Sequence, residues 1–161
     1  MLLRLRAPFR RPAHCSRMTS QIAFVGAGPT TIYTLHALLN RKPRPFALTI
    51  FETQPTAGRG TPYRPGWNDP AMLSNIASIE IPPLEETLIE WLNSQAPGRL
   101  VDLGIDPAEI GERTFYPRLA LGEYFYDQFQ ALLERARGQG IAVDVRTRCR
   151  VVDAVSEPDA M

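Results

Sequence analysis

Two glycines and one glutamate stand where they could bind a dinucleotide. Gly26 and Gly28 follow the apolar run at residues 22–25, and the apolar run at residues 47–51 ends on Glu52. After a strand, the first glycine permits a tight turn, and the second lets a pyrophosphate approach the backbone because it has no Cβ. A carboxylate at the end of the next strand accepts hydrogen bonds from ribose hydroxyls. The pattern predicts an FAD or NAD site and disfavours a ribose that carries a 2′-phosphate.

The residues after the glycines predict the start of a helix. Pro29 suits the first helical turn, where its fixed φ and missing N–H do no harm. The free N–H groups there, including that of Thr30, would face the phosphates together with the positive end of the helix dipole. Thr31 stands where the motif normally has a third glycine, so its Cβ and hydroxyl must be accommodated. A slightly larger helix-to-strand separation could do this, and the site is then less suited to tight binding. A turn without a ligand is the alternative, which the flanking strands, helix and acid disfavour.

The first half of the chain predicts a strand–helix–strand unit. Apolar positions recur at helical spacing over residues 29–40, between the two apolar runs. Two strands joined through a helix should be parallel. Residues 53–83 are rich in proline and glycine and have little periodicity, which is typical of a functional or disordered segment. The fold class is therefore α/β, with a Rossmann-like parallel sheet.

The second half adds two helices and a third strand. Residues 83–94 and 117–137 have apolar positions at helical spacing, and residues 95–116 between them show none. Residues 141–145 read as a third strand, and a further strand is expected to begin in residues 150–155.

Charge is divided unevenly along the 161 residues, of which 44% are apolar. Residues 1–51 carry eight basic and no acidic side chains, whereas residues 52–161 carry ten basic and seventeen acidic ones. Five of the first eight lie in a basic leader, residues 1–17, which we expect to be disordered or non-native. Residues 18–161 would form the domain. The basic excess is mostly this tail, so we expect no nucleic-acid partner.

The leader has two interpretations. An arginine-rich, acid-free segment could be an organelle transit peptide. We favour upstream sequence that is not native, with Met18 as the true start, because the first strand follows it directly. No apolar run is long enough to span a membrane or to form a secretion signal, so we expect a cytoplasmic protein that does not bind membranes.

Cysteine and histidine, the residue types most often found in metal sites and as nucleophiles or bases, are few and far apart in the sequence. Cys15 and Cys149 are far apart, and no metal-binding spacing is present. His36 lies within the first predicted helix, where a packing role is favoured over a catalytic one. We therefore expect no metal site, and the catalytic residues stay unknown.

Several short motifs follow one another over residues 20–155. They are Gly26-Ala27-Gly28-Pro29, Phe51-Glu52, Gly58-x-Gly60-x-Pro62-Tyr63, residues 73–78, residues 81–84, and Pro117-Arg118-Leu119-x-x-Gly122-Glu123-Tyr124. In this order they resemble the FAD-NAD(P)-binding flavoprotein family, which includes FAD-dependent urate hydroxylase and aspartate N-monooxygenase. The first two motifs occur in many flavoproteins, and the later ones are more specific.

The resemblance implies FAD as cofactor, with NAD(P)H as co-substrate of the full-length enzyme. The loop containing Gly60, together with Asn75 and Arg118, would line the FAD site or its approach, and backbone groups near Val151 would face the adenine. A surface ion pair between Arg118 and Glu123 or another acid is an equal alternative. The implied activity is that of a monooxygenase on a small polar substrate.

Members of this family continue well beyond residue 161, so we expect this chain to be the truncated N-terminal portion of an oxidoreductase. The alternative is a non-catalytic dinucleotide-binding fragment or interaction module. A weaker possibility is an NAD- or S-adenosylmethionine-dependent enzyme that uses the same strand, turn and helix. The substrate and the oligomeric state are not predicted.

Overall fold

The computed structural model describes residues 2–3 and 20–156. It contains a three-stranded parallel sheet in the order β2 (Gln21–Val25), β3 (Ala47–Phe51) and β4 (Ala142–Arg146). This arrangement confirms the predicted α/β class with a Rossmann-like parallel sheet. The third strand begins and ends one residue later than predicted.

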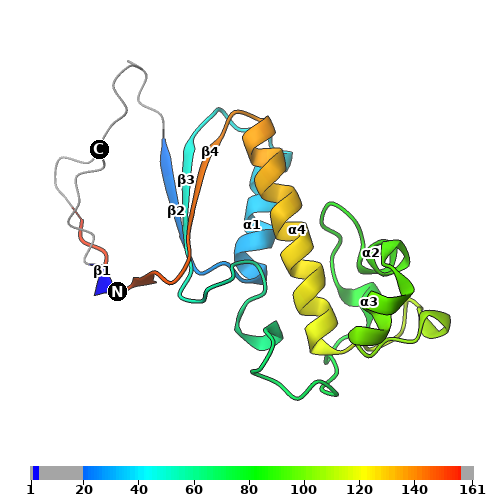
Figure 1. Cartoon of the computed structure of the whole chain (residues 1–161). Helices are drawn as coiled ribbons and strands as arrows, with labels where there is room; N and C mark the ends of the chain where they lie inside the picture. Colours follow the sequence, from blue (N-terminus) through cyan, green and yellow to red (C-terminus); the bar gives the residue numbers. More distant parts are fainter. Residues whose placement is uncertain (1, 4–19, 157–161) are drawn as a thin grey trace.

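Helices α1 (Pro29–Asn40) and α4 (Arg118–Gly138) pack against one face of the sheet (Figure 1). Their bounds agree with the two predicted helices to within one residue, because both sequences carry an apolar stripe at helical spacing. In the described part of the chain, no helix covers the opposite face (Figure 1). The core between sheet and helices includes Ile32, Leu35, Leu48, Ile50, Phe125, Phe129 and Leu132.

The long connection from β3 to α4 contains only short elements. These are η1 (Thr61–Tyr63), η2 (Ser78–Glu80), α2 (Leu88–Ser94), α3 (Pro97–Asp102) and η3 (Pro107–Glu109). The prediction that residues 95–116 are irregular was therefore wrong for α3 and η3. Both begin with a proline at the first position, a common helix-start signal that apolar periodicity does not detect.

Helix α2 is also shorter than the predicted helix over residues 83–94. Thr87 ends the preceding loop, since its hydroxyl accepts a hydrogen bond from the Glu90 N–H (3.1 Å) and the Glu90 carboxylate accepts one from the Thr87 N–H (2.7 Å). This capping box fixes the helix start. The buried Gln128 side chain accepts from the Glu85 N–H (3.0 Å), which holds the residues before the cap in a turn.

The strand expected in residues 150–155 is reduced to β5 (Arg150–Val151), which pairs in parallel with β1 (Leu2–Leu3). The sequence does not predict this pairing. Apart from residues 2 and 3, the basic leader lies outside the described residues. Among the residues that the structure describes, no helix is long and apolar enough to cross a membrane.

Candidate functional site

The glycine turn is held by hydrogen bonds on several sides. Gly26 has a positive φ (+91°), a conformation that glycine adopts without the steric cost of a Cβ, and its N–H donates to the Phe51 carbonyl (2.7 Å). The Thr31 hydroxyl donates to the Gly26 carbonyl (2.7 Å). The side chain that replaces the third glycine is thus accommodated by a hydrogen bond to the turn itself.

Glu52 lies at the end of β3 with its carboxylate facing the same turn. It is 8% exposed. Oε2 accepts from the Ala27 N–H (2.9 Å), whereas Oε1 accepts from the Gln54 N–H (2.9 Å) and the Thr53 hydroxyl (3.1 Å). A carboxylate offers about four acceptor positions, two on each oxygen. Oε2 therefore keeps one position for a ligand hydroxyl, and a second opens on Oε1 if the Thr53 hydroxyl rotates away.

The start of α1 lies next to this carboxylate and has no side-chain cap. Gly28 is the N-cap residue and Pro29 occupies the first turn. Gly28 is also in close contact with a second loop, because a Cβ added to it would lie 3.4 Å from the Gly60 Cα. The Gly58 N–H donates to the Ala27 carbonyl (3.0 Å), which joins this loop to the glycine turn. The second loop thus lies directly against the start of α1 at Gly28.

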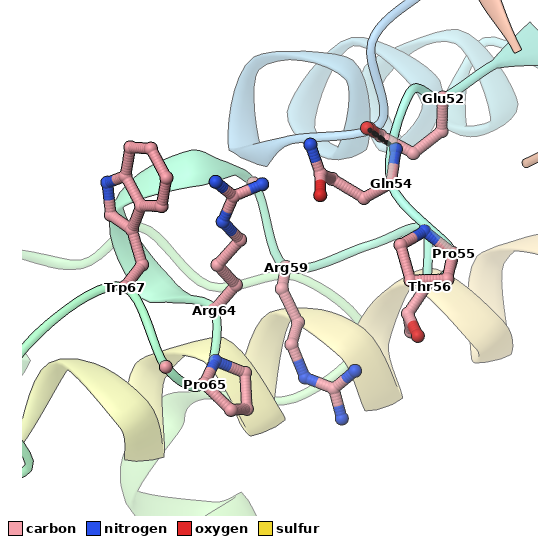
Figure 2. A pocket seen from close by; sticks show the side chains of 10 residues that line it. Glu52, Gln54, Pro55, Thr56, Arg59, Arg64, Pro65 and Trp67 are labelled. Atoms are coloured by element: carbon pink, nitrogen blue, oxygen red, sulfur yellow. Dashed lines mark hydrogen bonds between the residues drawn. The ribbon is translucent and has the colours of Figure 1, made fainter. Parts of the chain in front are cut away.

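A cavity of about 480 Å³ opens at the carboxyl end of β3. Glu52 lies at one end, and Arg64 and Trp67 lie side by side at the other, with Gln54 between them (Figure 2). The lining residues are Glu52, Gln54, Pro55, Thr56, Arg59, Gly60, Arg64, Pro65, Gly66 and Trp67.

Of the two arginines that line the cavity, only Arg64 has its charge available. Arg59 points toward α4 (Figure 2), where Nη2 lies 2.7 Å from the Glu123 carboxylate and the guanidinium lies 4.5 Å from the centre of the Tyr126 ring. The Arg64 guanidinium lies 4.0 Å from the centre of the Trp67 ring. Among the described residues, no carboxylate forms an ion pair with it. The cavity thus presents an acceptor at one end and a cation at the other.

The structure brings together only part of the predicted site. Glu52 and Gly60 line the cavity, and Gly26, Gly28, Pro29 and Thr30 form the adjoining turn and helix start.

The other three predicted residues do not line the cavity. Arg118 begins α4, and its Nε donates to the Leu73 carbonyl (3.2 Å), while Asn75 is exposed two residues further along that segment. Val151 lies in β5. Glu123, considered as a partner for Arg118, pairs with Arg59.

Sequence patterns did not identify several residues that line the cavity. Arg64 and Trp67 lie three residues apart in an irregular segment, where no period or motif marks them as neighbours. Gln54 and Thr56 lie two and four residues after Glu52, and this nearness along the chain was the one signal that could have identified them.

The clearly shifted pKa values belong to residues outside the cavity. Burial raises the pKa of Tyr33 to about 12, and its hydroxyl donates to the Pro82 carbonyl (2.8 Å). Burial likewise raises the pKa of Tyr124, whose hydroxyl donates to the Glu86 carbonyl (2.8 Å). Both groups fasten the loop before α2 to the helices, which is a structural role.

Comparison with known proteins agrees with this geometry. A family model described as FAD-NAD(P)-binding matches residues 23–161. The chain therefore belongs to the FAD-NAD(P)-binding family and is a dinucleotide-binding module. It is 48% identical over 133 residues to the uncharacterized protein YdhS of Escherichia coli (strain K12). The match covers 83% of this chain and 25% of YdhS, so the chain spans about a quarter of the length of that relative.

Proposed function

We propose that this chain binds FAD, with the adenosine diphosphate half of the cofactor in the cavity beside Glu52. The observation that carries the proposal is the open acceptor position on Glu52 Oε2, next to an uncapped helix start. A ribose hydroxyl is a donor that suits this position. The N–H groups of the first turn of α1 suit phosphate oxygens.

The charges of the cavity fit the same ligand. Arg64 supplies a cation whose charge no described carboxylate neutralises, and the Trp67 ring beneath it offers a flat apolar surface. A guanidinium binds phosphate oxygens through parallel N–H groups. The Glu52 carboxylate would repel a phosphate on the 2′-oxygen of the ribose. FAD or NAD therefore fits better than NADP at this position.

We further propose that residues 18–161 are the FAD module of an NAD(P)H-using monooxygenase of the cytoplasm, related to FAD-dependent urate hydroxylase and aspartate N-monooxygenase. A bound flavin would supply the redox chemistry, and the protein would bind and orient it. Asn75 and Arg118 would serve the flavin end or a small polar substrate, and backbone groups near Val151 would face the adenine. These assignments rest on the order of motifs along the chain.

The second candidate function is dinucleotide binding without catalysis. It is favoured by the observation that the site formed by the described residues consists of binding groups alone: acceptors, helix N–H groups and a cation. In this case the chain would bind FAD or ADP but would not oxidise NAD(P)H.

Reconstitution with FAD tests the proposal. The full chain is incubated with FAD, freed of excess ligand by gel filtration, and assayed for flavin absorbance that elutes with the protein. We expect retained FAD that ADP displaces and riboflavin does not, because the ADP half carries the binding. Protein that retains no flavin and binds no ADP would refute the proposal. Oxidation of NAD(P)H by the loaded chain would separate the enzyme from the non-catalytic module.

A further inference from the structure

One peptide group in the glycine turn is hydrogen-bonded at both ends. The peptide joining Gly26 to Ala27 accepts at its carbonyl from the Thr31 hydroxyl (2.7 Å). Its N–H donates to Glu52 Oε2 (2.9 Å). Because a peptide is planar, the orientation of its carbonyl also determines the direction of its N–H. Thr31 and Glu52 thus fix the same peptide plane from opposite sides.

This peptide needs such restraint, because glycine places little restriction on its own ψ angle. Gly26 already has a φ of +91°, and no atom outside its immediate neighbours would lie within 4 Å of an added Cβ. Because Gly26 has no Cβ, its own ψ angle does not fix the orientation of the Gly26–Ala27 peptide. Thr31 is 9% exposed, so its hydroxyl is a nearby donor for the carbonyl in a site largely closed to solvent.

We propose that Thr31 is a positioning residue for the ribose-binding carboxylate. Its hydroxyl holds the Gly26 carbonyl, which aims the Ala27 N–H at one lone pair of Glu52 Oε2 and leaves the other open to a ligand hydroxyl. This inference rests on the proposed binding of an adenosine diphosphate group at Glu52. It reverses the expectation from the sequence, where a threonine at the third glycine position was a steric obstacle.

Three substitutions distinguish a positioning role of the Thr31 hydroxyl from steric obstruction by the Thr31 side chain. The two roles predict opposite changes in ADP affinity for Thr31→Gly. Thr31→Ser keeps the hydroxyl, Thr31→Val keeps the shape without the hydroxyl, and Thr31→Gly restores the usual motif residue. If the hydroxyl positions the carboxylate, ADP affinity measured by calorimetry stays within about twofold for the serine variant and falls about three- to tenfold for the other two. If the side chain is only an obstacle, Thr31→Gly tightens binding. Tighter or unchanged binding by the glycine and valine variants would overturn the proposal.

Amide hydrogen exchange in the free protein gives a readout that does not depend on the ligand. Protection of the Ala27 N–H should persist in Thr31→Ser and decrease at least about fivefold in Thr31→Val and Thr31→Gly. Equal protection in all four proteins would also overturn the proposal. If the four proteins show the expected differences in Ala27 protection but wild type binds no ADP, the proposed function is refuted and the positioning role of Thr31 remains. If circular dichroism shows that Thr31→Val or Thr31→Gly does not fold, a comparison of Thr31→Ser with the other variant still tests the role of the hydroxyl.

Discussion

The two ends of the cavity are built differently. Glu52 stands at the end of a central strand, is 8% exposed, and accepts three hydrogen bonds through its carboxylate. Trp67, at the other end, is 61% exposed in an irregular loop and holds Arg64 by stacking. The strand end can therefore select a ligand by hydrogen-bond geometry, whereas the loop end contributes charge and apolar surface.

The loop end is nevertheless anchored to the helices by close backbone contacts and by an ion pair. Gly60 packs against the start of α1, and its neighbour Arg59 pairs with Glu123 on α4. Gly122 on the same helix is in such close contact with the Tyr63 carbonyl that a Cβ there would clash with it. The loop is thus positioned by glycines at close approaches and by one ion pair.

The largest effect is expected at the strand end, from Glu52→Ala. This change removes the acceptor for the ribose and the partner of the Ala27 N–H, so ADP affinity measured by calorimetry should fall about 10- to 100-fold, the range of hydrogen bonds to charged groups. Glu109→Ala, which removes the same charge from an exposed position away from the cavity, serves as the control and should bind normally. Equal affinities of the two variants would show that the carboxylate is not a ligand.

The anchoring of the loop end is tested by Gly60→Ala. A Cβ there would lie 2.8 Å from Pro29 Cδ, and the residue has a positive φ (+75°). We expect a loss of about 1–3 kcal/mol in the free energy of unfolding, from combined backbone strain and overpacking. Gly66→Ala is the matched control, since φ is also positive (+76°) but no atom would lie within 4 Å of the new Cβ. A similar loss in both variants would mean that the contact with Pro29 contributes nothing.

A smaller effect is expected at the loop end, from Arg64→Ala. Loss of the cation should weaken ADP binding about fivefold at low salt, as expected for a partly exposed charge. The difference from wild type should shrink at high salt, and Arg64→Lys should restore part of it. If the loss of ADP affinity does not depend on salt, Arg64 contributes through its stacking on Trp67 and not through its charge.

Much of this architecture follows from sequence patterns. Strands β2, β3 and β4, helices α1 and α4, and the position of Glu52 at the end of β3 were predictable, because apolar periodicity and a glycine motif are local signals. The pairing of Arg59 with Glu123, 64 residues away, and the stacking of Arg64 on Trp67 depend on how an irregular loop folds. The role of the Thr31 hydroxyl was hidden for another reason: a motif compares residue types, while a hydrogen bond depends on where one atom lies.

The smallest effect on ADP affinity is expected at the strand end, from Thr53→Ala. Thr53 donates to Glu52 Oε1 at 3.1 Å and is exposed. Because a ligand hydroxyl can take its place, Thr53→Ala should change ADP affinity by no more than about twofold. A clear loss measured in the same titration would mean that the hydroxyl orients the carboxylate and does not compete with the ligand.

The claim that Glu52 binds a ribose is tested most directly by changing the ligand. Calorimetric titrations compare ADP with 2′,3′-dideoxyadenosine diphosphate, which lacks both ribose hydroxyls, on the wild-type chain and on Glu52→Ala. We expect the dideoxy ligand to bind wild type about tenfold more weakly than ADP, and the two ligands to bind the variant alike. Equal affinity of wild type for both ligands would contradict the assignment of Glu52 to the ribose.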